Sequence, residues 1–328
     1  MKTVAFLTNR DNISVGSHRI WVIDLSTYLS DVGIQTTITN NPRTASEYDI
    51  VICGKSDVKL ACDFKKSNPN TYVGIINLAA DRTNLPIDFV IVGSLEEMDS
   101  LSSYKHVLLF PLIESMYSVD KPKIHRKKDL IQICFHGSFT HLSKFQPSLK
   151  QALEELDKEI NFELLIITND TDFKWEVGKP NIKNITIKTW NLNTIKEDIL
   201  GCDIGIVPNI TTYSSKDQES NPELGLYDTD YILRLKNKSN AGRAFVFHQL
   251  GIPVVADFTP SNFHIMGGND CGYLVSSANG WKQSILKLTN TRNRQEISNK
   301  AFEKFRSLYD TKHWANKLYT ELIEITHG

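Results

Sequence analysis

The chain lacks several features that would place it in a special class of protein. No stretch approaches the ~18 uninterrupted apolar residues that span a bilayer, and residues 1–10 become polar too early for a signal peptide. The net charge of -1 gives no basis for binding nucleic acid through the whole surface. The five cysteines are scattered, and no Cys or His spacing suits a metal ion. We therefore expect a cytoplasmic protein with no metal site and no nucleic-acid partner.

What the chain does contain is two series of short apolar segments, and its 328 residues are enough for two domains. The first series is 4–7, 36–39, 49–54, 72–76, 89–93 and 106–111, and the second is 130–135, 162–168, 185–190, 203–208 and 252–256. Helical patterns and polar loops separate the segments, which is the order of a doubly wound sheet. The sequence therefore predicts two Rossmann-like α/β domains.

The boundaries follow from the same pattern. We predict an N-terminal α/β domain over residues 1–118, a linker over 119–129, a C-terminal α/β domain over 130–310 and an amphipathic helix over 311–328. The apolar stripe of that helix must dock on a domain, and it could pack back on the N-terminal one. The basic residues of the linker are usually solvated in such runs, although on a membrane-associated enzyme they could contact anionic lipid at the inner face of the membrane.

Residues 211–230 are polar and lack a clear periodicity. A plain connector of this length is unusual inside a compact domain. A mobile lid or acceptor loop and a plain surface insertion are the two interpretations, and both stay open.

A basic segment before the last of these apolar segments predicts a phosphate-binding helix entrance. Ser239 or Asn240 can cap the helix, and Lys238 and Arg243 place cations near its positive end. Gly251 can supply the left-handed residue that lets the chain turn into the next strand. Backbone N–H groups at such an entrance suit a phosphate. An ordinary helix–strand unit with a solvated basic end is the alternative.

These features resemble the GT-B glycosyltransferases. The likeness lies in the two doubly wound domains, in Asp-Ile-Gly-Ile-Val-Pro-Asn at 203–209, and in Lys-Ser-Asn-x-x-Arg at 238–243 before Leu-Gly-Ile-Pro-Val-Val-Ala at 250–256. It points to the family 4, or "glycosyl transferases group 1", type and is strongest over about residues 130–310.

The resemblance implies a metal-independent hexosyltransferase that needs no cofactor. It implies a nucleotide-sugar donor held by the C-terminal domain, a glycan or lipid-linked glycan acceptor held by the N-terminal domain, and transfer in the cleft between them. Transfer would proceed with retention of configuration, in the assembly of surface polysaccharides or glycans.

Carried over to this sequence, the resemblance also assigns site residues. Donor binding falls on residues that follow the strands of the C-terminal domain or enter its phosphate-binding helix: Gly137, Ser138, Lys144, Trp190, Asn191, Asn209, Ser239 and Asn240. Among these, Trp190 and Asn191 lie where the base of the donor is held, although Trp190 could equally be a core residue. Lys238 and Arg243 are the candidates that stabilise the leaving phosphate.

In the N-terminal domain, the matched residues are Gly16, Ser17, His18 and Arg19, in a glycine loop that approaches donor and acceptor. His18 is a catalytic candidate because it follows the first strand, where doubly wound sheets bind ligands. Asp81 could bind an acceptor hydroxyl or act as a base. A packing histidine and a turn aspartate are the corresponding structural interpretations.

The sequence also departs from the family pattern. The pair of glutamates seven residues apart is not recognisable, and Val246 stands where the second would fall. The donor therefore stays open between a nucleoside diphosphate sugar and a CMP-linked sugar. A sugar-nucleotide 2-epimerase and a non-catalytic sugar-nucleotide-binding protein of the same fold are the alternative functions.

Overall fold

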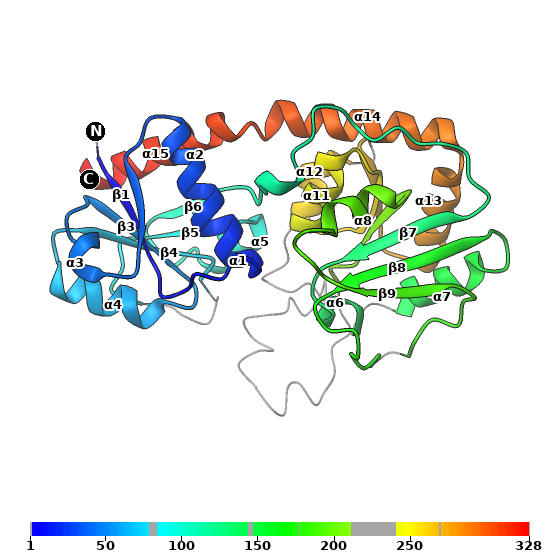
Figure 1. Cartoon of the computed structure of the whole chain (residues 1–328), viewed down its shortest axis with the longest axis horizontal. Helices are drawn as coiled ribbons and strands as arrows, with labels where there is room; N and C mark the ends of the chain where they lie inside the picture. Colours follow the sequence, from blue (N-terminus) through cyan, green and yellow to red (C-terminus); the bar gives the residue numbers. More distant parts are fainter. Residues whose placement is uncertain are drawn as a thin grey trace. The chain divides into compact units, whose positions relative to one another are not determined.

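The computed structural model describes residues 2–78, 84–143, 147–176, 178–210, 241–268 and 270–327 of the chain. The chain forms two compact units (Figure 1), of which unit 1 comprises Met1–Ser115 and Tyr309–Gly328 and unit 2 comprises Met116–Leu308. Each unit contains a six-stranded parallel sheet flanked by helices. This confirms the predicted pair of doubly wound α/β folds.

Unit 1 has the sheet order β2-β1-β3-β4-β5-β6. Its strands are β1 (Val4–Leu7), β2 (Thr36–Thr39), β3 (Ile50–Gly54), β4 (Tyr72–Ile76), β5 (Phe89–Val92) and β6 (Val107–Leu109). Its helices are α1 (Gly16–His18), the π-helical η1 (Arg19–Asp24), α2 (Leu25–Asp31), α3 (Pro42–Ala45), α4 (Val58–Ser67), α5 (Leu95–Ser100) and α15 (Thr311–His327). The central strands are almost fully buried because helices cover both faces of a parallel sheet. The edge strand β2 is only partly buried.

The C-terminal helix α15 packs on unit 1, beside α2 (Figure 1). Its stripe of Ala315, Leu318, Leu322 and Ile325 is buried. The Tyr319 hydroxyl accepts a hydrogen bond from the Lys2 backbone N–H at 2.8 Å, and donates one to the Lys2 carbonyl at 3.1 Å. The amphipathic helix therefore completes the N-terminal unit, as its apolar stripe required.

Unit 2 has the sheet order β12-β11-β10-β7-β8-β9. Its strands are β7 (Ile131–His136), β8 (Phe162–Thr168), β9 (Ile185–Thr189), β10 (Ile204–Val207), β11 (Val254–Asp257) and β12 (Gly272–Val275). Its helices are α6 (Thr140–Ser143), α7 (Pro147–Leu156), α8 (Ile195–Gly201), α11 (Gly242–Leu250), α12 (Pro260–Met266), α13 (Ala278–Thr289) and α14 (Thr291–Leu308), and the short turn η2 (Ser115–Tyr117) leads into the unit. Strand β12 and helices α12 to α14 were not among the predicted elements.

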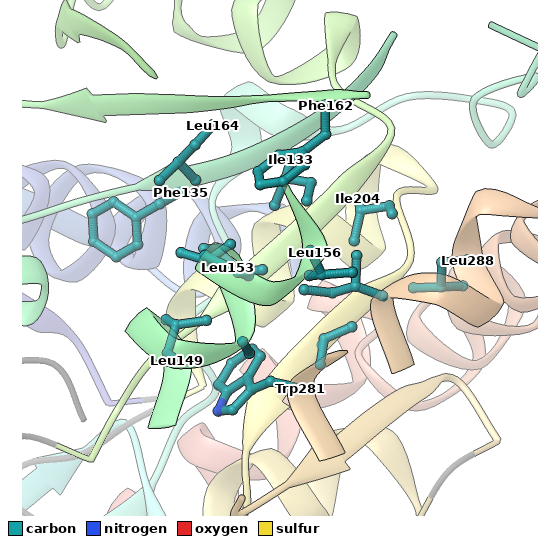
Figure 2. Close-up of a cluster of buried hydrophobic side chains, with 14 of the residues drawn as sticks. Ile133, Phe135, Leu149, Leu153, Leu156, Phe162, Leu164, Ile204, Trp281 and Leu288 are labelled. Carbon is teal, nitrogen blue, oxygen red and sulfur yellow. The ribbon is translucent and has the colours of Figure 1, made fainter. Parts of the chain in front are cut away.

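The main core of unit 2 lies between the sheet and the helices α7 and α13 (Figure 2). Phe135 and Phe162 come from the sheet, Leu153 comes from α7, and Trp281 and Leu288 come from α13. All five side chains are at most 1% exposed. This cluster packs α7 and α13 against the sheet of unit 2.

The segment predicted as a solvated linker is partly built into unit 2. The ammonium group of Lys123 donates to the Cys202 carbonyl, and the Lys123 N–H donates to the Leu250 carbonyl at 3.1 Å. His125 is 5% exposed and its Nε2 lies 3.1 Å from the Gly251 carbonyl oxygen. Burial lowers the pKa of Lys123 to about 8 and that of His125 to about 4. The basic run is therefore only partly a solvated surface.

Gly251 ends α11 in the left-handed conformation, as predicted, with φ 68° and ψ 45°. A Cβ atom there would lie 2.6 Å from the Pro122 Cβ and 2.7 Å from the Lys123 N. We expect Gly251→Ala to lower the free energy of unfolding by about 2–4 kcal/mol, because backbone strain and overpacking add. Urea denaturation measures this loss.

Gly268→Ala is the matched control. Gly268 has a φ of 76° and nothing within 4 Å of the added Cβ, so its substitution introduces backbone strain alone. We expect a loss of about 1–2 kcal/mol there. Equal losses at both positions would show that the contact with Pro122 does not constrain Gly251.

Candidate functional site

The candidate site of unit 2 lies at the carboxyl ends of β7 and β10. The chain winds outward from β7 through β8 to β9, and in the opposite direction from β10 through β11 to β12. The winding direction therefore reverses between β7 and β10. Doubly wound sheets bind ligands at this point, outside the carboxyl ends of the strands.

Gly137 and Arg243 meet at this reversal point. Gly137 follows β7 with a φ of 123°, a conformation that side chains other than glycine rarely adopt. A Cβ on Gly137 would lie 3.3 Å from the Arg243 Cδ, so glycine allows the arginine to pass close to the strand end. Arg243 Nη2 donates to the Pro208 carbonyl, after β10, at 3.2 Å. One arginine thus bridges the two strands.

Arg243 lies in the first turn of α11, where the helix dipole is positive. Its guanidinium lies over the Phe135 ring, with 5.2 Å between Cζ and the ring centroid. Burial lowers the pKa of Arg243 to about 10, so the side chain stays charged at neutral pH. Its Nη1 atom is shielded from solvent, and no residue in the described part of the chain accepts its hydrogen bond. The Nη1 group can therefore donate a hydrogen bond to a bound anion.

The start of α11 corrects one prediction. The helix begins at Gly242 and Ala241 is its N-cap, so the predicted cap at Ser239 or Asn240 is one or two residues too early. Alanine has no side-chain acceptor, so the N-cap residue itself makes no side-chain cap. Lys238, Ser239 and Asn240 themselves lie outside the described residues, as do residues 211–230 and the candidates Lys144 and Asp81.

A buried network of hydrogen bonds lies close to Arg243. Asp257, at the end of β11, accepts hydrogen bonds at 2.8 Å from the backbone N–H groups of Asn209 and Ile210. Asn262 donates to the Asn209 side chain at 3.1 Å. Burial raises the pKa of Asp257 to about 7, while the two N–H bonds and the charge of Arg243 favour its ionised form. Asn209 thus belongs to the supporting network.

Sequence reasoning missed Asp257. The signal was an aspartate directly after the apolar residues Val254, Val255 and Ala256, at the carboxyl end of a strand. An acidic residue in such a place is either a structural acceptor or a ligand-binding group. Its role in the network depends on the pairing of β10 with β11, which the sequence alone does not reveal.

His136 also lies under the site, at the end of β7. It is 6% exposed, and its ring contacts Phe247 edge-on with 4.9 Å between centroids. Burial, together with the nearby charge of Arg243, lowers the pKa of His136 to about 3. The imidazole is therefore neutral at physiological pH and does not compete with Arg243 for an anion.

The other donor candidates lie at different places in unit 2. Ser138 is exposed directly after Gly137. Trp190 is half-buried after the edge strand β9, and its backbone N–H donates to the Thr168 carbonyl at 2.8 Å. The Asn191 side chain accepts from the Asn193 N–H at 2.8 Å, so its oxygen shapes the turn before α8. The structure brings Gly137, Ser138, Asn209 and Arg243 to the reversal point, and places Trp190 and Asn191 after the edge strand.

In unit 1 the predicted glycine loop is helical. Gly16, Ser17 and His18 form α1, and Arg19 begins η1, because the N–H groups of His18 and Arg19 donate to the Val15 carbonyl at 3.0 Å. A Cβ on Gly16 would make only an ordinary contact, at 3.8 Å, so no turn requires this glycine. The sequence had predicted an open loop as far as His18.

Arg19 is part of a structural ion pair. Its Nη2 lies 2.7 Å from the Glu114 Oε2, and its Nη1 donates to the Ile13 carbonyl at 3.0 Å. Burial raises the pKa of Glu114, and the adjacent guanidinium opposes this shift. Arg19 thus ties the start of η1 to the chain after β6.

Unit 1 has its own pocket at the carboxyl ends of β1, β3 and β4. The sheet order reverses between β1 and β3, the position that the ligand-binding rule again selects. The pocket is lined by Thr8, Arg10, Ser17, His18, Trp21, Val22, Gly54, Lys55, Ser56, Asp57, Ile76 and Asn77. Two of the predicted residues, Ser17 and His18, therefore line a pocket of unit 1.

Comparison with known proteins gives matches in structure only. No family model matches the sequence, and no curated protein matches it. HepE from Anabaena, solved in complex with UDP and glucose, is 10% identical and has a TM-score of 0.67 over 99% of this chain and 100% of that chain. A glycosyltransferase from Rickettsia africae is 12% identical, with a TM-score of 0.63 over 99% of this chain and 98% of that chain.

A longer protein also matches. TarM from S. aureus, solved in complex with Fondaparinux, alpha-GlcNAc-glycerol and UDP, is 14% identical, with a TM-score of 0.57 over 85% of this chain. The match spans only 55% of the TarM chain. These likenesses, with the two parallel sheets, show that the chain has the GT-B fold, as the sequence predicted. In the described parts, no helix has the length and apolarity to cross a membrane.

Proposed function

We propose that the protein is a glycosyltransferase that transfers a sugar from a nucleoside diphosphate sugar to an acceptor. The observation that carries this proposal is the meeting of Arg243 and Gly137 at the reversal point of the unit 2 sheet. A buried guanidinium whose shielded Nη1 has no acceptor among the described residues, at a helix start, suits the oxygens of a diphosphate. Solved proteins of the same fold carry UDP, which makes UDP the first nucleotide to test.

Unit 2 would hold the donor. Arg243, in the first turn of α11, would bind the diphosphate, with Gly137 and Ser138 beside it. The family resemblance adds Lys144, Lys238, Ser239 and Asn240 to the donor side. Donors fixed in place stabilise the charge that develops on the leaving nucleotide more than they stabilise the bound substrate, so they lower the barrier to transfer.

The family resemblance leads us to propose transfer with retention. The bond from the anomeric carbon to the phosphate oxygen breaks, and the acceptor oxygen bonds to that carbon on the same face. The departing phosphate takes the proton of the acceptor hydroxyl, so the step needs no separate base. Arg243 supplies a fixed positive charge to the leaving group, and transfer would need no metal or other cofactor.

Unit 1 would hold the acceptor, in the pocket lined by Ser17 and His18. A glycan or lipid-linked glycan is the acceptor class that the family resemblance implies. His18 lines this pocket, and burial keeps its pKa below the ordinary value, so its neutral ring can donate a hydrogen bond to an oxygen of the acceptor.

A ligand series tests the donor site directly. We expect UDP to raise the melting temperature of the full chain, because ligand at 100 times its Kd stabilises a protein by about 2.7 kcal/mol. UMP should stabilise less, and uridine should give no shift, since Arg243 contacts the phosphates in this proposal. GDP, ADP and CMP are compared at the same concentration. A shift from uridine equal to that from UDP would contradict the assignment of Arg243 to the diphosphate.

The reaction is then tested with the sugar nucleotide that binds. A transferase releases the nucleotide together with a glycosylated acceptor, whereas a 2-epimerase converts the sugar nucleotide with no acceptor present. A binding protein releases nothing. Conversion without acceptor, or binding without any turnover across a panel of glycan acceptors, would contradict the proposed transfer.

A further inference from the structure

The pocket of unit 1 combines a helix start with a tight turn. The Asp57 N–H donates to the Gly54 carbonyl at 2.8 Å, which places Lys55 and Ser56 at the tip of the turn after β3. The ten-residue helix α4 begins directly afterwards, at Val58. Its first turn brings N–H donors and the positive end of the helix dipole to the rim of the pocket. This end of the pocket therefore favours negative charge.

The N-cap residue of α4 leaves those donors uncapped. An aspartate at this position usually accepts a hydrogen bond from the first turn. Here the Asp57 carboxylate accepts from the Thr8 hydroxyl at 2.8 Å and makes no hydrogen bond to the first-turn N–H groups. The donors at the start of α4 are thus left for another acceptor.

His18 gives an independent indication of a ligand. It lines the pocket and is only 5% exposed, yet no described residue makes a hydrogen bond with its Nδ1. A buried polar atom without a hydrogen-bond partner costs free energy. Such an atom in a pocket therefore points to a partner that a ligand would supply. Burial lowers the pKa of His18, with opposing effects from Asp11 and Asp57. The neutral ring can donate one hydrogen bond to an oxygen.

The charges that line the pocket favour an anion. Arg10 and Lys55 are exposed cations on its wall, and among the lining residues that the structure describes Asp57 is the one carboxylate, hydrogen-bonded to Thr8. The Glu97 carboxylate interacts electrostatically with Lys55. Burial raises the pKa of Glu97 to about 7, so this group has lost part of its charge at neutral pH.

We propose that this pocket binds an oxyanion carried by the acceptor, with a phosphate-bearing polyol or sugar as the substrate class. The inference rests on the proposed function, because it takes unit 1 as the acceptor side. Arg10, Lys55, His18 and the start of α4 hold the anion by its charge and its oxygens. The neighbouring hydroxyl groups of the acceptor remain free to react.

The first experiment follows the ring nitrogens of His18 by NMR in the full chain labelled with ¹⁵N. The His18→Gln variant assigns the signals. We expect glycerol 3-phosphate to shift them in a saturable way and glycerol to leave them unchanged. Inorganic phosphate should bind more weakly than the ester, because the acceptor carries the anion in this proposal. No shift with the ester, or equal affinity for inorganic phosphate, overturns the inference.

Two lysine variants test whether the charge acts locally. Lys55→Ala removes a cation from the pocket, and we expect it to weaken glycerol 3-phosphate binding at least about fivefold. Lys66→Ala removes an exposed cation in the last turn of α4, about 12 Å along the same helix, and should change binding less than about twofold. Equal weakening by the two variants would mean that the anion only senses the overall charge, which overturns the site.

UDP binding is measured on the same samples to separate the two proposals. If UDP binds and no anion moves the His18 signals, the inference fails and the proposed donor site stands. If glycerol 3-phosphate binds at His18 and no nucleotide binds, the proposed function fails. The acceptor role of the pocket then fails too, because it rests on that function. Binding of both supports both proposals.

Discussion

Replacing Arg243 with alanine is expected to lower kcat by about 10²- to 10³-fold, the loss seen when a preorganised donor to a developing charge is removed. The side chain reaches the reversal point of the unit 2 sheet from the first turn of α11 and keeps its charge despite burial. Arg243→Lys keeps a charge but loses the fork of parallel donors, so an intermediate loss of about tenfold is expected. Initial rates with the sugar nucleotide that binds measure both.

Arg294 supplies the control for this prediction. It is fully buried in unit 2, and its Nη1 and Nη2 donate to the carbonyls of Leu288 at 2.8 Å and Arg126 at 2.9 Å. Arg294→Ala should lower the melting temperature and leave the kcat of the folded protein within about twofold, because the hydrogen bonds of this arginine stabilise the fold and do not reach the candidate site. An unchanged kcat in Arg243→Ala, or an equal fall in both variants, would remove Arg243 from the mechanism.

Trp281 is expected to give the largest effect on stability. Its side chain is fully buried in the unit 2 core, on the side of Leu149, Leu153 and Leu156 of α7 (Figure 2). We expect Trp281→Ala to lower the free energy of unfolding by about 3–5 kcal/mol, through lost burial and the cavity left behind. Urea denaturation followed by circular dichroism measures the change.

Trp175 and a conservative variant provide the comparison. Trp175 packs on the same core but is only partly buried, so Trp175→Ala should cause a smaller loss, about 1–2 kcal/mol. In the described part of the chain the Trp281 Nε1 has no acceptor, so Trp281→Phe removes an unsatisfied donor and should lose less than about 1.5 kcal/mol. A loss in Trp175→Ala as large as that in Trp281→Ala would contradict the burial argument.

Local patterns were sufficient to predict most of the sheet strands. Val4–Leu7, Thr36–Thr39 and Phe162–Thr168 are strands with the predicted bounds. Such segments are defined by short apolar runs and β-branched residues, which are properties of neighbouring positions. Strand β12, Gly272–Val275, was missed because it begins with a glycine, which weakens the local strand pattern.

The candidate site was only partly predictable. The sequence pointed to Gly137 and Arg243, and the structure places them next to each other. It also pointed to Arg19, which pairs with Glu114, and to Asn209, which supports Asp257. Long-range partners decide such roles, and the sequence does not state which residues will be neighbours. Asp257, Lys55 and the start of α4 were missed for the same reason.

The sequence by itself determined that this protein is a two-part α/β molecule with a glycine turn at Gly137, because apolar periodicity and glycine positions act within a few residues. Only the tertiary structure decided which strand ends meet, that α15 completes unit 1, and that Arg10, His18 and Lys55 share a pocket. Parallel strands bring the carboxyl ends of distant segments to one edge, and their order across the sheet is set by the packing of the whole domain.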